Sequence, residues 1–278
     1  MDIPQKYYRA IRRCEPVSAE GLTLYPITVA EYDDFTAARP AIEIIQQSLP
    51  VRFASMPLLS AFYVMEVEAW AQALPSVGFF YRALLFLALS LRLGEGLEAP
   101  ERVKMFRVNT DPKDPLRLIS LQFSLCGEEK TRITPVQFQR LRPILAAQNG
   151  IELVSESANP DLIEAERDIA EQSSPGLDGS IGSLITSVSA LSGADEKEID
   201  TWPILKLVER QKAYYRMLNF LICGIAETQG TKWKGGNPFP SPFFNRKTDG
   251  SAALMPLDSF AGGEGTKAVR QAMGANNG

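Results

Sequence analysis

Two neighbouring stretches of the chain, residues 57–74 and 78–93, are apolar on nearly every side of a helical projection. Residues 75–78, which begin with Pro75 and end with Gly78, have the composition of a turn between them. A helix that is apolar all round is stable only where protein or membrane surrounds it. The two stretches therefore predict a pair of helices that form the inside of the first core.

The second stretch is too short to cross a membrane. Its uncharged part, residues 83–91, is bounded by Arg82 and Arg92 and is about half of the ~20 residues that a spanning helix needs. Residues 1–16 lack the apolar centre of a signal peptide. We therefore expect a soluble protein of the cytoplasm that has no membrane partner.

The three cysteines, Cys14, Cys126 and Cys223, stand far apart and form no CxxC pair. This spacing argues against a cysteine zinc site, and the odd count argues against a disulfide framework. A reduced chain of the cytosol is the simplest interpretation. Cys223 lies in the apolar run LNFLICGIAE without a basic neighbour, which predicts a buried and inert thiol.

The chain contains no histidine. A catalytic site in this chain therefore cannot use the usual general base near neutral pH or a Ser–His or Cys–His nucleophile pair. A metal site cannot use the commonest ligand. The balance of 29 Lys and Arg against 33 Asp and Glu argues against a protein whose main partner is duplex nucleic acid. We predict a protein without enzymatic activity, with no catalytic site, no metal site and no cofactor.

One acidic cluster is the main candidate for a metal-binding or catalytic site. Glu164, Glu166, Asp168 and Glu171 follow Asn159, where a charged helix is predicted. Carboxylates at this spacing can hold a metal or act as an acid–base pair, and a hydrolase that uses them stays a third functional class. Because negative charge is favourable in the first half of a helix, we interpret the cluster as a solvated face.

The middle of the chain changes from helical to alternating patterns. Residues 103–108, 116–125 and 131–134 alternate apolar with polar or β-prone residues, which predicts a small antiparallel sheet. A helix over 134–149 follows, with Thr134 as its N-cap, Pro135 at its first position and a stop signal at Asn149 and Gly150.

The N-terminal third contains further elements. LTLYPI at 22–27 predicts a short strand or an extended arm. A helix over about 28–38 follows, in which Thr28 and Glu31 have the spacing of a capping box. Another helix is predicted over 41–49, before Pro50.

The predicted fold class is α+β and mostly α-helical. It comprises a helical N-terminal unit, a small antiparallel β-sheet in the middle, and a helical C-terminal unit with an extended tail. Residues 1–172 form the first domain and SSPGLDGS at 173–180 forms a flexible linker. Residues 181–247 form a helical domain with an aromatic and Pro-rich extension, and 248–278 form a mobile tail.

The longest predicted helix covers 202–229. Apolar residues such as Tyr214, Leu218 and Leu221 follow one another at helical spacing, so they share a stripe. The periodicity is the same for a helix that faces its own core and for one that faces a partner. Both interpretations stay open at this point.

KWKGGNPFPSPFF, which follows the long helix, interleaves aromatic residues with cations and prolines. Three roles fit this pattern: docking onto the protein's own helices, binding a partner protein, or stacking on single-stranded bases. We expect Trp233 to dock on the protein itself and the later phenylalanines to lie nearer a partner surface. The candidate protein-binding residues of the C-terminal region are Trp202, Tyr214, Tyr215, Trp233, Phe239, Phe243 and Phe244.

Three segments resemble a family of uncharacterised proteins from prophages and tailed phages. They are LYPITVAEYDDF at 24–35, ITPVQFQRLRPILAAQNGIEL at 133–153, and the segment 189–247 that begins SALSGADEKEID. The short helix, linker and long helix of the last segment resemble the layout of phage tail assembly chaperones. One departure is that this chain adds a β-containing middle and a large N-terminal helical unit, whereas many such chaperones are shorter and mostly helical.

The resemblance implies a non-enzymatic cytosolic protein that is absent from the finished virion. Tail assembly chaperones hold the tape measure protein and help to recruit tail tube subunits. We therefore expect a tail morphogenesis factor whose partners are the tape measure and tail tube proteins, with self-association as a further possibility. The alternative is a structural tail or neck component that is retained in the virion.

Overall fold

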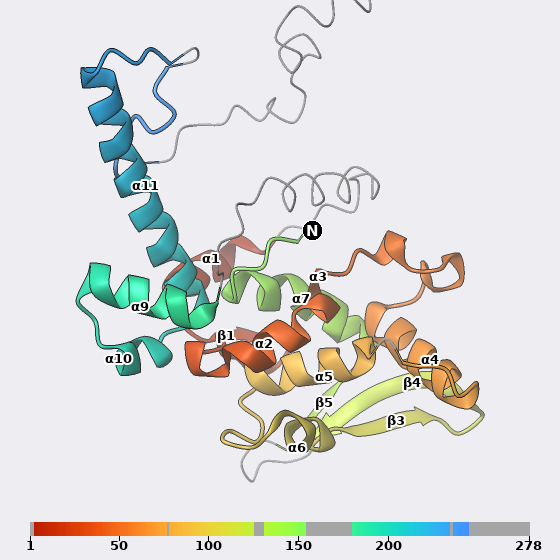
Figure 1. Cartoon of the computed structure of the whole chain (residues 1–278). Helices are drawn as coiled ribbons and strands as arrows, with labels where there is room; N and C mark the ends of the chain where they lie inside the picture. The colour runs from red at the N-terminus through yellow and green to blue at the C-terminus, as the bar shows by residue number, and fades with distance from the viewer. Residues whose placement is uncertain (1–2, 77, 125–130, 154–179, 234–235, 245–278) are drawn as a thin grey trace, which may run out of the picture. The chain divides into compact units, whose positions relative to one another are not determined.

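The computed structural model describes residues 3–76, 78–124, 131–153, 180–233 and 236–244 (Figure 1). Its fold class is α+β, with helices predominating and two small antiparallel sheets, so this prediction is confirmed. The chain divides into two compact units, Met1–Gln211 and Lys212–Gly278. Of the predicted linker at 173–180, only Ser180 is described, and the predicted tail at 248–278 lies outside the described residues.

The predicted pair of apolar helices forms the core of the first unit. These are α4 (Leu58–Ala71) and α5 (Phe79–Ser90), and Gly78 precedes α5 with a φ of 70°. Residues 83–90 of α5 are all buried, as its composition requires. α5 packs against α2 (Tyr32–Ala38), α3 (Pro40–Glu43), α4 and α6 (Ala99–Lys104).

The chain begins with α1 (Gln5–Arg12) and a two-stranded sheet, neither of which the sequence patterns predicted in full. β1 (Val17–Ala19) pairs antiparallel with β2 (Leu22–Leu24), and only the second strand was expected. Glu20 and Gly21 form the turn with φ values of 51° and 79°. Two successive left-handed residues give the backbone twist that suits a tight hairpin.

A three-stranded sheet follows, in the order β3-β4-β5, with β3 (Arg107–Asp111), β4 (Asp114–Phe123) and β5 (Thr131–Ile133) all antiparallel. The strand predicted at 103–108 is wrong in its first half, because residues up to Lys104 belong to α6. Pro100 in the first turn favours a helix there. Arg102, which is buried, donates to the carbonyl of Leu97 at 2.9 Å and to Glu31 at 2.8 Å.

The helix predicted over 28–38 is present as the 3₁₀ turn η1 (Val29–Glu31) and α2, with the Thr28–Glu31 capping box formed. The helix predicted over 41–49 is mostly wrong. α3 ends at Glu43, and the 3₁₀ turns η2 (Gln46–Ser48) and η3 (Val51–Phe53) follow. The cause is tertiary, because the Arg142 guanidinium donates to the backbone carbonyls of Ile42, at 2.8 Å, and Ile44.

Arg142 belongs to α7 (Pro135–Gln148), which begins after the predicted N-cap Thr134, and Thr134 forms a capping box with Gln137. Two more buried polar residues at the end of α7 bind the N-terminal backbone. The Asn149 Oδ1 accepts the N–H of Ile27 at 2.8 Å, and the Gln148 Nε2 donates to the carbonyl of Leu24 at 3.2 Å. Without these side chains, the buried N–H of Ile27 and carbonyl of Leu24 would lose these hydrogen-bond partners.

The first unit is completed by α9 (Ile181–Ser192), α10 (Glu196–Asp200) and the start of α11 (Ile204–Thr228). Gly193 ends α9 with a φ of 72°, and Asp195 caps α10 by accepting the N–H of Lys197 at 3.0 Å. The predicted long helix over 202–229 is present as α11.

The start of α11 is tied to the segment around Thr28. The N–H of Ile204 donates to the carbonyl of Ile27 at 2.9 Å, and the N–H of Val29 donates to that of Trp202 at 2.8 Å. These two bonds flank an isolated antiparallel bridge between Thr28 and Pro203.

Asn149→Ala should destabilise the first unit by about 1–3 kcal/mol, because it leaves the buried N–H of Ile27 without an acceptor. Thermal unfolding measures the effect. Gln47→Ala is the matched control, since it removes an exposed side-chain amide and should change the free energy of unfolding by less than ~0.5 kcal/mol. Equal stability of the two variants would contradict the structural role of Asn149.

Candidate protein-binding surface

The long helix α11 carries the predicted candidate residues in two different environments. Its first turns, up to Gln211, belong to the first unit, where Ile204 and Leu207 are buried. Trp202 precedes the helix and is 6% exposed. Its Nε1 donates to the Glu198 Oε1 at 3.3 Å, and the Lys206 Nζ lies 3.7 Å from the ring centroid. Trp202 therefore packs inside the first unit and does not contribute to the surface defined next.

In the second unit, α11 has an exposed apolar side. Met217, Leu218, Leu221, Ile222 and Ile225 are exposed by between 43% for Met217 and 61% for Ile222. Residues three and four positions apart lie on the same side of a helix, so these five form one continuous surface. We call them the apolar α11 face. Of the two interpretations that the sequence left open, the described residues favour the exposed one.

The other side of α11 is covered by the segment that follows it. The chain turns back after Thr231, whose N–H donates to the carbonyl of Ala226 at 3.0 Å, and runs alongside the helix (Figure 1). The Arg216 guanidinium then donates to the carbonyl of Phe243 at 2.9 Å. Cys223, on the side away from Leu221, is 5% exposed, which agrees with the predicted buried thiol.

The aromatic residues of the second unit fall into a covered and an exposed group. Tyr214, Trp233 and Phe239 are partly buried, and the Phe239 ring meets that of Tyr215 edge-to-face at 5.8 Å. Phe243 and Phe244 are 76% and 74% exposed. Trp233 is thus partly covered, and of the three phenylalanines at 239–244 that follow it, Phe239 is partly covered as well and only Phe243 and Phe244 are largely exposed. That the later phenylalanines lie at a partner surface stays a prediction.

The described residues contain no group of three or more His, Cys, Asp or Glu side chains that could hold a metal ion. The acidic cluster at 164–171 lies outside those residues, so its interpretation as a solvated face stays a prediction. Burial raises the pKa of the Cys14 thiol above its usual value, although Lys206 acts in the opposite direction. A raised pKa disfavours the thiolate, which is the nucleophilic form.

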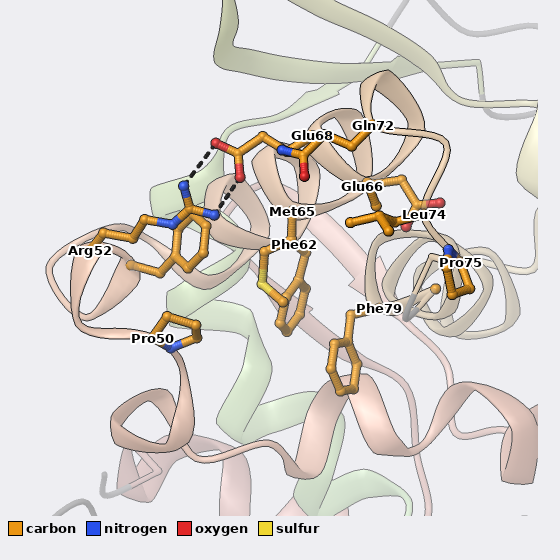
Figure 2. A pocket seen from close by; sticks show the side chains of 13 residues that line it. Pro50, Arg52, Phe62, Met65, Glu66, Glu68, Gln72, Leu74, Pro75 and Phe79 are labelled. Atoms are coloured by element: carbon orange, nitrogen blue, oxygen red, sulfur yellow. Dashed lines mark hydrogen bonds and ion pairs between the residues drawn. The ribbon is translucent and has the colours of Figure 1, made fainter.

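The first unit contains a pocket that the sequence analysis did not identify (Figure 2). It has a volume of about 260 Å³ and is formed by residues 50–53, by α4 and by the turn before α5. The rings of Phe62 and Phe79 stack in its floor with centroids 5.4 Å apart and planes 24° apart. No motif signals such a pocket, because its walls come from separate stretches of the chain.

Charged side chains stand at two sides of this pocket. On one side, the Arg52 guanidinium binds both carboxylate oxygens of Glu68, with 3.1 Å between Nη1 and Oε1. On the other side, near Leu74 in Figure 2, Glu66 accepts a hydrogen bond from the Ser76 hydroxyl. Ser76 also accepts the N–H of Gly78 at 2.8 Å, which links the turn before α5 to α4.

No helix in the part of the chain that the structure describes is both long enough and apolar enough to cross a membrane. No protein-family model, curated protein or solved structure matches the chain. The apolar α11 face and the resemblance noted in the sequence are therefore the two observations that bear on function.

Leu218→Asp should change the free energy of unfolding by less than about 1 kcal/mol, because Leu218 is 46% exposed and an added charge there stays in water. Leu207→Asp, on the same helix, is the matched comparison. Leu207 is 1% exposed, so this variant buries an unpaired charge and should cost several kcal/mol, on the order of 4 or more. Chemical denaturation of both variants makes the comparison. A large loss with Leu218→Asp would show that the apolar α11 face is part of a core.

Proposed function

We propose that this chain is a non-enzymatic factor of phage tail morphogenesis. It acts as a tail assembly chaperone in the cytoplasm of the host cell, where it binds the tape measure and tail tube proteins. The observation that carries the proposal is the apolar α11 face, whose five side chains are each at least 43% exposed. The sequence resemblance to tail assembly chaperones supplies the class of partner.

An exposed apolar face on a helix is a recognised means of protein binding. Amphipathic helices lay such a face into a groove or against other helices, with contacts at i, i+3, i+4 and i+7. Leu218, Leu221, Ile222 and Ile225 have this spacing. Contiguous apolar surface is unfavourable in water and marks interaction sites in soluble proteins. The face therefore fits a protein whose work is to hold other proteins.

Phe243 and Phe244 offer a second contact in the same unit. Their rings lie edge-to-face with centroids 6.5 Å apart, and both are largely exposed. Aromatic residues are enriched in protein interfaces because they bury a large area with few rotatable bonds. The hydrogen bond from Arg216 to the carbonyl of Phe243 holds one end of this pair against α11.

The runner-up function, a tail or neck component retained in the virion, would use the same surface. The two functions differ in whether the finished particle contains the protein. Mass spectrometry of purified particles separates them, because a chaperone is absent from finished particles and a structural component is present at stoichiometric copy number.

Leu221→Asp/Ile225→Asp should weaken binding to at least one of the two tail proteins and leave the fold intact. The chain is co-expressed with the tape measure and tail tube proteins of the same phage, and recovery of each partner is measured after affinity purification. Two charges in an interface cost about 3 kcal/mol or more, so recovery of at least one partner should fall more than tenfold.

Gln5→Asp/Thr231→Asp is the matched control, because it adds the same two charges at exposed positions outside the apolar α11 face. It should retain wild-type recovery. Equal recovery with both double variants would refute the proposal. If neither tail protein binds and only the wild-type chain forms oligomers in size-exclusion chromatography, the face serves self-association instead.

A further inference from the structure

The pocket lined by Phe62 and Phe79 has the size of a site for one side chain. Its volume of about 260 Å³ lies below the ~300–1,000 Å³ typical of sites for cofactors and drug-sized molecules. Protein interfaces, in contrast, are often anchored by single side chains that enter small, well-packed pockets. The size therefore favours an anchor residue of a protein partner over a small-molecule ligand.

The pocket is apolar in its floor and has exposed apolar residues around it. Phe62 and Phe79 form the stacked pair, and Met65 lies beside Phe62 in Figure 2. At the edges, Leu74 is 57% exposed and Val51, between two residues that line the pocket, is 91% exposed. An apolar side chain bound here would cover the floor, and the residues beside it would cover part of the edge.

The charge of the lining is negative. Glu68 is neutralised by Arg52, whereas Glu66, among the residues that the structure describes, receives a hydrogen bond from Ser76 and no ion pair. Arg82 lies 6.0 Å from the Phe79 ring centroid but is not among the residues that line the pocket. A partner that places a cation beside its apolar anchor would complement the Glu66 carboxylate.

We propose that this pocket binds an apolar side chain of a partner protein segment, with a neighbouring Lys or Arg of that segment paired to Glu66. The site is independent of the apolar α11 face, and it gives the first unit a binding role of its own. Its specificity combines shape, set by the stacked rings, with charge, set by Glu66. The ligand class is therefore a basic-apolar segment of a protein.

A peptide titration tests the proposal on the full chain, labelled with ¹³C in its methionine methyl groups. The probe is a Gly/Ser-based peptide whose central Phe is flanked on each side by Lys, and its matched control has Glu in place of Lys. The Met65 methyl resonance, identified by its loss in Met65→Leu, should shift saturably with the basic peptide. The acidic peptide should bind at least fivefold more weakly.

Two variants locate the binding in the pocket. Glu66→Gln should weaken binding of the basic peptide about fivefold, which is the effect expected when a partly exposed ion pair is lost. Glu95→Gln removes the same charge at an exposed site elsewhere and should leave binding unchanged. Ala69→Leu places a larger side chain in the pocket wall and should prevent the shift. Circular dichroism melting checks that each variant is folded.

Absence of a saturable Met65 shift with the basic peptide, in the folded wild-type protein, would overturn the proposal. So would equal binding of the basic and acidic peptides, because Glu66 would then have no part in recognition. Leu221→Asp/Ile225→Asp should bind the basic peptide like the wild type. The proposed tail function and this pocket can therefore fail separately.

Discussion

Hydrogen bonds to buried side chains of α7 and of the residue after it hold the backbone between Leu24 and Ile44 in place. Arg142 binds the carbonyls of Ile42 and Ile44 at the end of α3, Gln148 binds the carbonyl of Leu24, and Asn149 accepts the N–H of Ile27. All three side chains are at least 93% buried. Because a buried backbone group without a partner is costly, these bonds select one arrangement of the N-terminal chain around α7.

The same N-terminal segment also holds the base of α11. Ile27 donates its N–H to Asn149 and accepts the N–H of Ile204 with its carbonyl, so one residue connects α7 to the start of the long helix. Within the first unit, burial of Ile204 and Leu207 completes this attachment. The first turns of α11 are therefore structural, whereas the exposed apolar residues that we assign to partner binding begin at Met217.

Local signals predicted those elements whose stability is decided locally. Thr134 and Pro135 start α7, Asn149 ends it, and the apolar composition of α5 requires burial. The helix expected at 41–49 failed because Arg142, a hundred residues away, binds the carbonyls of Ile42 and Ile44. Of the hairpin at 17–24, only the second strand was predicted.

The candidate site was predictable only in part, for a related reason. Periodicity shows that Leu218 and Leu221 share a side of α11, but core and interface helices have the same period. Exposure depends on what the rest of the chain covers, as the difference between Leu207 and Leu218 on one helix shows. The pocket around Phe62 and Phe79 was not predictable, because it exists only after three segments have packed together.

Site-specific photo-crosslinking tests the central claim, that the apolar α11 face binds tail proteins, most directly. A benzophenone amino acid is placed at Leu221 in cells that assemble the particle, and at Glu227, which is exposed on another side of α11, as the control position. The account predicts a crosslink from position 221 to the tape measure or tail tube protein, and none from position 227. Crosslinks of equal yield from both positions, or none to either tail protein from position 221, would contradict it.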